Sequence, residues 1–344
     1  MTEFKTPTSN KYRSRVQDNP NLQTPIKIPA SPFLEQIGYG CGVNVFSLER
    51  SPKVGFIRSP WAIKKRNRKI EESEKYNERI RFEADVLRNL NHPNIVGFRA
   101  FTEVTDGEPC LAMEKLDASL GDKIEERIMN DDEPFPAKDI LKIAYEIVKG
   151  LVYLHHTAHI LHGDIKSYNI LVSDDFNVVK LCDFGVSLPL NESLELDTSK
   201  GNFGYVGTEC WSAPEIINED GPVTNKADIW ACGLVVWEMI ALSPPHVEIN
   251  ESYLDESGLD DSVIEIPQKE EINEQNTSMD DSVIFCAEIR KYGTRPSLPA
   301  INLGKEYQSV LEIFFACTTI DYKIRPSAKG LDNYFKNCIF KIKK

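Results

Sequence analysis

The sequence predicts an α+β fold in two lobes: a small lobe with a five-stranded antiparallel sheet plus one helix, and a larger, mainly helical lobe. Five short strand-like runs come first, at 33–37, 43–48, 61–64, 95–102 and 110–113, separated by Gly and Pro. One helical pattern interrupts them, and after about residue 116 longer helical patterns take over. With 41% hydrophobic residues among 344, the chain can bury a sizeable core.

The helix of the small lobe is predicted over residues 70–90. Its apolar residues recur at steps of three and four, which is the spacing of one helix face; they are Tyr76, Ile80, Ala84, Leu87 and Leu90. In the larger lobe a wide apolar stripe predicts a helix over 137–155, and helical patterns resume at 306–317. Two short runs at 169–172 and 178–181 are typical of a hairpin.

Charge and composition exclude several classes of protein. The net charge is −13, which argues against direct nucleic-acid binding because a phosphate-backbone binder needs excess Lys and Arg. Residues 248–288 alone hold 13 acidic residues against one lysine. The longest apolar stretch, 231–242, is interrupted by Glu238 and is too short to cross a membrane. The eight cysteines are scattered, which is typical of reduced thiols in an intracellular, cytoplasmic or nuclear protein.

The chain therefore divides into unequal parts. Residues 1–31 are polar and rich in Ser, Thr and Pro, so we expect a disordered regulatory tail. One domain follows at 32–340, with a small lobe at 32–115 and a larger lobe at 116–340. The acidic segment 248–288 is expected to be a loop insert, and 341–344 form a basic end.

Two features of the small lobe suggest phosphate binding. Glycines between the first two strands, at positions 38, 40 and 42, would let backbone N–H groups approach a phosphate chain, although glycine-rich hairpins are also common as plain turns. Lys64 ends a strand, and Glu83 falls on the apolar face of the predicted helix. An ion pair between them would satisfy both charges and hold the ammonium ready for phosphate oxygens.

Further motifs identify a family. His162-Gly163-Asp164-Ile165-Lys166-Ser167-Tyr168-Asn169, Cys182-Asp183-Phe184-Gly185, the run from Gly207 to Glu215 and Arg325-Pro326-Ser327 stand in an order and spacing that resemble the eukaryotic protein kinases. The resemblance covers about residues 33–340 and implies the two-lobed protein-kinase fold.

The resemblance implies a role for each motif residue. Asp183 and Asn169 would hold Mg²⁺ as hard oxygen ligands. Asp164 would accept or orient the proton of the substrate hydroxyl, and Lys166 would neutralise the migrating phosphoryl group. Lys166 and Thr208 are typical of Ser/Thr or dual-specificity kinases. The implied ATP-binding residues are Ile37, Gly38, Tyr39, Gly40, Cys41, Gly42, Val45, Ala62, Lys64, Met113, Glu114 and Leu116.

Other residues are better explained by structure than by catalysis. The resemblance implies a buried ion pair between Glu215 and Arg325, and it implies that Asp228 anchors the catalytic-loop backbone. His162 is expected to face the core. His155 and its neighbours, His156 and His159, end a helix, where solvation or a helix-terminal charge is favoured over metal binding. Cys41 and Cys182 flank the nucleotide site, where packing is favoured over redox sensitivity.

Two positions depart from the family pattern. Val43 stands at the third glycine position of the phosphate-binding loop, with an extra glycine at 42. Gly163 replaces the arginine that would bind a phosphorylated activation segment, so ordering by phosphate is in doubt.

The runs at 93–103 and 181–190, residues 42–45 and the acidic insert before Gly293 narrow the resemblance to a group of protein kinases whose C-terminus is a PDZ ligand. These are MAP-kinase-kinase-like enzymes linked to mitosis. MAP kinases or histones are therefore expected among the protein substrates. This chain ends in Lys344, which a PDZ pocket with an apolar slot should reject.

Thr6, Thr24 and Ser31 each precede a proline, which predicts phosphorylation by an upstream cyclin-dependent kinase, and Thr198 is a candidate in the activation segment. The function expected is Mg·ATP-dependent phosphorylation of Ser or Thr, with Tyr as a further acceptor. Two alternatives stay open at this point. One is a pseudokinase scaffold that presents the acidic loop, and the other is a kinase of small metabolites.

Overall fold

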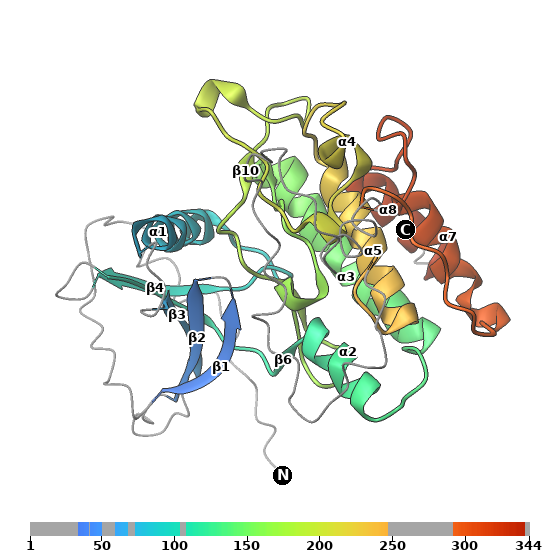
Figure 1. Cartoon of the computed structure of the whole chain (residues 1–344), viewed down its shortest axis with the longest axis horizontal. Helices are drawn as coiled ribbons and strands as arrows, with labels where there is room; N and C mark the ends of the chain where they lie inside the picture. Colours follow the sequence, from blue (N-terminus) through green and yellow to red (C-terminus); the bar gives the residue numbers. More distant parts are fainter. Residues whose placement is uncertain are drawn as a thin grey trace, which may run out of the picture.

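The computed structural model describes residues 34–40, 42–49, 59–67, 73–103, 108–246 and 292–340. These residues form two lobes, with a sheet and one helix in the smaller lobe and a bundle of helices in the larger (Figure 1). The predicted tail at 1–31, the acidic insert at 248–288 and the basic end at 341–344 lie outside the described residues.

The smaller lobe contains the predicted five-stranded antiparallel sheet, in the order β1-β2-β3-β5-β4. Its strands are β1 (Glu35–Gly40), β2 (Val43–Leu48), β3 (Trp61–Arg66), β4 (Phe98–Glu103) and β5 (Pro109–Glu114). The prediction that the fourth strand begins at residue 95 is wrong. Ile95 instead forms a parallel bridge with Leu181 of the larger lobe, and Val96 N–H donates to the Leu181 carbonyl at 2.9 Å. This stretch therefore joins the lobes before β4 begins.

Helix α1 (Ser73–Asn89) packs on this sheet through the predicted apolar face. Tyr76, Ile80, Ala84 and Leu87 are all buried. Glu83 is buried on the same helix at 1% exposure. A carboxylate at that depth needs a charged partner, and the sheet supplies it.

The larger lobe is built around α5 (Lys226–Ala241), which is buried on nearly every face. A helix that is apolar all round is typical of a core position. The other helices are α2 (Leu120–Met129), α3 (Ala137–Tyr153), α4 (Pro214–Ile217), α7 (Gln308–Cys317) and α8 (Ala328–Tyr334). Helix α3 packs against α5 and α8, as Figure 1 shows. No helix among the described residues is long and apolar enough to cross a membrane.

The end of α3 departs from the prediction. The apolar stripe predicted a helix to residue 155, but α3 ends at Tyr153 and continues as one π-helical turn, Leu154–Ala158. His159 then takes a left-handed backbone conformation, with φ of 53°. The predicted solvation of His155 is wrong, because this side chain is fully buried.

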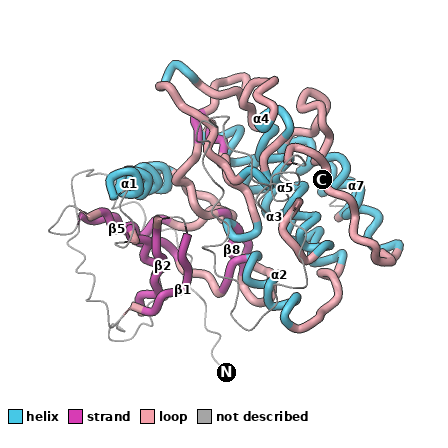
Figure 2. The backbone as a smooth tube through the Cα atoms, viewed as in Figure 1, coloured by secondary structure: helices cyan, strands magenta, loops and turns pink. Residues whose placement is uncertain are grey.

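Five short strands among the described residues, β6 to β10, lie in the larger lobe beside the loops that carry the family motifs. β8 (Ile170–Val172) and β9 (Val179–Leu181) form the predicted hairpin, joined at its edge by β6 (Ala118–Ser119). β7 (Ile160–Leu161) pairs with β10 (Leu188–Pro189). Loops and short 3₁₀ turns make up the segment between β10 and α4 (Figure 2). The loop between β7 and β8, the loop between β9 and β10 and this segment carry the motif residues.

Candidate active site

Lys64 of β3 lies between two carboxylates. Its Nζ atom is 2.8 Å from Oε2 of Glu83 and 2.9 Å from Oδ1 of Asp183. The predicted ion pair between Lys64 and Glu83 is confirmed, and both side chains are buried. A backbone contact adds to it, since Phe184 N–H donates to Glu83 at 3.4 Å. Helix α1, the sheet and the segment after β9 therefore meet at one ammonium group.

The charges in this cluster shift one another's pKa. Burial disfavours the charged form of Lys64, but Asp183 and Glu83 outweigh it and raise the pKa of the ammonium above its ordinary value. Burial likewise opposes ionisation of Asp183, but the charge of Lys64 lowers the pKa of this carboxyl to about 2. Asp183 is thus an anion at neutral pH, and its side chain remains 39% exposed toward the space between the lobes.

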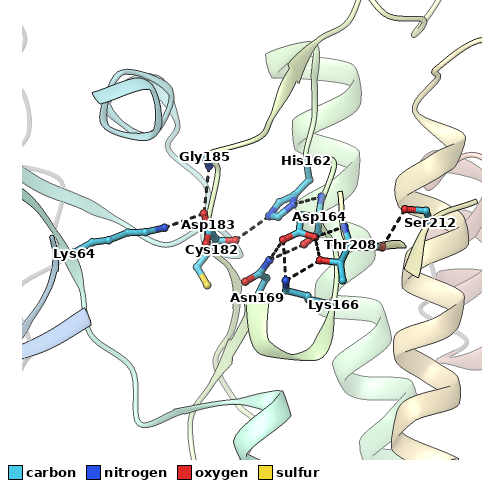
Figure 3. Close-up of polar contacts among 10 residues, drawn as sticks. All are labelled: Lys64, His162, Asp164, Lys166, Asn169, Cys182, Asp183, Gly185, Thr208 and Ser212. Carbon is cyan, nitrogen blue, oxygen red and sulfur yellow. Dashed lines mark hydrogen bonds and ion pairs between the residues drawn. The ribbon is translucent and has the colours of Figure 1, made fainter. Parts of the chain in front are cut away.

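The loop after β7 holds a second polar cluster centred on Asp164. Asn169 donates its amide N–H to both the carbonyl and Oδ2 of Asp164, each at 2.8 Å. Lys166 Nζ lies 3.1 Å from Oδ2 of Asp164. Thr208 donates its hydroxyl to Oδ1 at 2.7 Å and receives a hydrogen bond from Lys166 at 2.9 Å. Figure 3 shows Asp183 between Lys64 on one side and this cluster on the other.

Asp228 of α5 binds the backbone of the loop that carries Asp164. Its carboxylate accepts the backbone N–H groups of His162 at 2.9 Å and Gly163 at 3.0 Å, and it lies 2.8 Å from Nε2 of His155. The predicted anchoring role of Asp228 is confirmed. His162 is buried, as predicted, and its Nε2 lies 2.9 Å from the carbonyl oxygen of Cys182. The loop is thereby tied both to the core helix and to the residue before Asp183.

The sequence that carries this arrangement matches a known family. The model of the protein kinase domain matches residues 33–334. The chain belongs to the protein kinase family. It is 43% identical to the human lymphokine-activated killer T-cell-originated protein kinase, over 95% of this chain and 96% of that protein. It is also 36% identical to the serine/threonine-protein kinase dst2 of Dictyostelium discoideum, over 53% of this chain and 15% of that protein. It is 34% identical to cell division control protein 7 of Schizosaccharomyces pombe, over 50% of this chain and 15% of that protein.

The activation segment of this kinase is attached through its backbone. Leu196 N–H donates to the Val223 carbonyl at 2.9 Å, and Asn225 N–H donates to that of Leu194 at 3.0 Å. Thr198, in the 3₁₀ turn Thr198–Lys200, is exposed. Its predicted phosphorylation stays a prediction. Thr6, Thr24 and Ser31 lie outside the described residues.

A buried ion pair fixes the base of this segment. Arg325 donates to both carboxylate oxygens of Glu215, at 2.7 and 2.9 Å. The side chain of Arg325 is fully buried, and that of Glu215 is 4% exposed. The pair implied by the resemblance is confirmed.

The arginine missing at position 163 has a structural explanation. Gly163 has φ of +80°, a left-handed conformation that favours glycine. A Cβ atom at this position would lie 3.2 Å from the carbonyl oxygen of Val186. The backbone here therefore disfavours any side chain, arginine included.

The positions that the resemblance implies for ATP lie along β1, β2, β3 and β5 and in the stretch just after β5. Ala62 and Met113 are buried, whereas Ile37 is 42% exposed. The remaining described positions implied for ATP are Gly38, Tyr39, Gly40, Gly42, Val45 and Leu116, and Cys41 lies outside the described residues. Glu114 N–H donates to the carbonyl of Gly97 at 2.8 Å. This backbone N–H is therefore already engaged within the protein.

Glu238 is an important residue that the sequence reasoning missed. It is buried in α5, and its two oxygens accept from the Ser167 hydroxyl at 2.6 Å and from Nε1 of Trp211 at 2.8 Å. Burial raises the pKa of Glu238 to about 7, although both hydrogen bonds oppose this. Glu238 connects the catalytic loop to the segment before α4. The available signal was a lone acid inside an apolar run.

Cys182 immediately precedes Asp183. Burial and the adjacent carboxylate of Asp183 raise the pKa of its thiol well above the ordinary value. Among the described residues no three His, Cys, Asp or Glu side chains gather to hold a metal ion. Mg²⁺ commonly uses one or two protein oxygen ligands together with substrate phosphates. Asp183 and Asn169 offer such oxygens, and Asn169 has already committed its amide nitrogen to Asp164.

Proposed function

We propose that this kinase transfers the γ-phosphoryl group of Mg·ATP to serine and threonine hydroxyls of protein substrates. The arrangement around Asp164 carries the proposal. Four donors, from Asn169, Thr208 and Lys166, hold its carboxylate. A carboxylate fixed in this way can receive a hydroxyl proton without first reorganising.

Each charged residue has a defined task in this proposal. Lys64, fixed by Glu83, would contact phosphate oxygens, and Lys166 would neutralise the charge that develops on the transferred group. Asp183 and Asn169 would hold Mg²⁺, which when bound neutralises phosphate charge and orients the nucleotide. Phosphoryl transfer needs mainly this positioning and charge neutralisation.

The proposed acceptor class rests on Thr208 and on the relatives. Thr208, a residue type that Ser/Thr kinases carry at this position, bridges Asp164 and Lys166. Several of the relatives carry serine/threonine-protein kinase in their names. Tyrosine is the additional acceptor expected of a MAP-kinase-kinase-like enzyme.

The proposed cellular role is in mitotic or MAP kinase signalling, within the cytoplasm, the nucleus or both. One relative is named for control of cell division and another as a MAP3K. MAP kinases and histones are the first protein substrates to try. An upstream cyclin-dependent kinase would act on the proline-directed sites Thr6, Thr24 and Ser31.

The test is transfer of radiolabelled γ-phosphate from ATP to a mixed panel of proteins and small metabolites, followed by phospho-amino-acid analysis. Purified wild type is compared with Asp183→Asn and with the matched surface control Asp85→Asn. We expect labelled Ser and Thr in proteins with wild type and the control, and none with Asp183→Asn. Equal background in all three, with or without prior cyclin-dependent kinase treatment, would favour a scaffold. Label on metabolites alone would favour a small-molecule kinase.

A further inference from the structure

The glycine-rich loop contacts α1 at Gly42, the extra glycine that departs from the family pattern. Gly42 is buried and has φ of +78°. A Cβ atom built on it would lie 2.2 Å from Cε1 of Tyr76 and 2.3 Å from Cδ1 and Cζ. Only a glycine can therefore occupy this place while the ring stays where it is. The loop backbone rests directly on the ring.

Both partners are fixed in the smaller lobe. The carbonyl of Gly42 accepts a hydrogen bond from Asn67 N–H at 2.9 Å, at the end of β3. Tyr76 is only 7% exposed, and the guanidinium carbon of Arg79 lies 5.9 Å from its ring centroid. The ring therefore cannot swing away without breaking the packing of α1.

The same face of α1 contacts the metal-binding segment. Tyr76, Arg79 and Glu83 are spaced at i, i+3 and i+7, so they lie in one row along the helix. The carbonyl oxygen and Cβ of Arg79 lie 3.9 and 4.0 Å from the place where a Cβ of Gly185 would be. Glu83 holds Lys64 at 2.8 Å. One rigid helix thus touches the phosphate-binding loop, the segment after Asp183 and the phosphate-binding lysine.

We infer that Tyr76 is a positioning residue that holds Gly42 in place, so that the packing of α1 on the sheet fixes where the glycine-rich loop lies over the nucleotide phosphates. The extra glycine at 42 makes this contact possible. This inference rests on the proposed use of ATP. It gives α1 a second contact with the phosphate-binding region, through Tyr76 and the loop, in addition to the ion pair of Glu83 with Lys64.

The experiment compares Gly42→Ala, Tyr76→Ala, the double variant and Tyr76→Phe. Gly204→Ala is the matched control, because no atom lies within 4 Å of a Cβ built there. For each variant we measure equilibrium binding of a fluorescent Mg·ATP analogue, KM for ATP, kcat and thermal melting. The backbone strain of alanine at position 42 is present in both tyrosine backgrounds, so comparing them isolates the collision with the ring.

We expect Gly42→Ala to weaken nucleotide binding and raise KM for ATP by about 10-fold, with a smaller change in kcat. Tyr76→Ala should weaken binding about threefold, and Tyr76→Phe should stay within twofold of wild type because it keeps the ring. In the double variant the obstructing ring is gone, so binding should be at least threefold tighter than in Gly42→Ala. If the binding defects of Gly42→Ala and Tyr76→Ala multiply in the double variant, the inference is wrong. It is also wrong if Gly42→Ala binds the nucleotide as tightly as wild type does.

A second measurement needs no nucleotide. Amide hydrogen exchange in β1 and β2 should rise in Tyr76→Ala but not in Tyr76→Phe, while exchange in α3 stays as in wild type. Unchanged exchange in β1 and β2 would contradict the inference even if Gly42→Ala failed to fold. Failure of wild type to bind the ATP analogue would count against the proposed function instead. The exchange result would still show whether Tyr76 holds the loop at Gly42.

Discussion

The hydroxyl of Thr208 donates to Oδ1 of Asp164 at 2.7 Å, across 44 residues of sequence. We expect Thr208→Ala to lower kcat by about 10- to 100-fold, because a hydrogen bond to a charged group contributes about 1.5–3 kcal/mol. Thr208→Ser keeps the hydroxyl and should retain most of the activity. Initial rates on a protein substrate test this, and an alanine variant with wild-type kcat would remove Thr208 from the mechanism.

Arg325 should matter for stability rather than chemistry. Arg325→Met leaves Glu215 buried without a partner, and we expect a loss of about 3–5 kcal/mol in the free energy of unfolding. Lys336→Met, which breaks the more exposed pair with Asp332, should cost less than about 1 kcal/mol. Urea denaturation of both variants makes the comparison. Equal losses would mean that burial of the Glu215 pair has no special effect.

Glu238 predicts a pH dependence of stability. Its pKa is about 7 in the folded chain against an ordinary 4.5, so between these values the folded state binds more protons than the unfolded state. Stability should therefore fall as pH rises through this window, by up to about 3 kcal/mol.

The matched experiment uses Glu238→Gln, which cannot ionise. The free energy of unfolding of this variant minus that of wild type should be larger at pH 8 than at pH 5, because only wild type loses stability as Glu238 ionises. Glu126→Gln, at an exposed position, should show no such difference. If urea denaturation gives parallel pH profiles of the free energy of unfolding for wild type and Glu238→Gln, Glu238 is not the group that causes the pH dependence.

Restoring the family arginine should not restore the family's regulation. Gly163→Arg puts a side chain at φ of +80° and close to the Val186 carbonyl, so we expect kcat to fall at least fivefold. Phosphorylation of Thr198 should not rescue it. The comparison with Gly163→Ala, which has the same strain without the charge, is made by kinase assay before and after phosphorylation. Higher activity of the arginine variant upon phosphorylation would show that the loop tolerates the exchange.

Periodicity and motif spacing predicted most of what positions the site. The apolar repeat gave the buried face of α1, and a carboxylate on that face required a cation, which is Lys64. Asp228 and the Glu215–Arg325 pair followed from the family resemblance and are where it implied. These features are encoded locally or in a family pattern, so a single sequence reveals them.

Features set by tertiary contact were not predictable in this way. Residue 95 looks like part of a strand, yet its pairing partner is Leu181 in the other lobe. His155 looks like a helix end in water, yet Asp228 draws it into the core. The contact of Gly42 with Tyr76 depends on a left-handed backbone angle and on the position of a helix, neither of which residue spacing encodes.

Cys182 gives the proposed nucleotide site an unusual chemical character. A cysteine directly before Asp183, the aspartate proposed to hold Mg²⁺, invites the design of an electrophilic inhibitor that would bond to its sulfur. The raised pKa of this thiol means that almost none of it is thiolate at neutral pH, and thiolate is the reactive form. Selectivity for this kinase by covalent labelling must therefore come from holding the electrophile against the sulfur, because the sulfur's own reactivity is low.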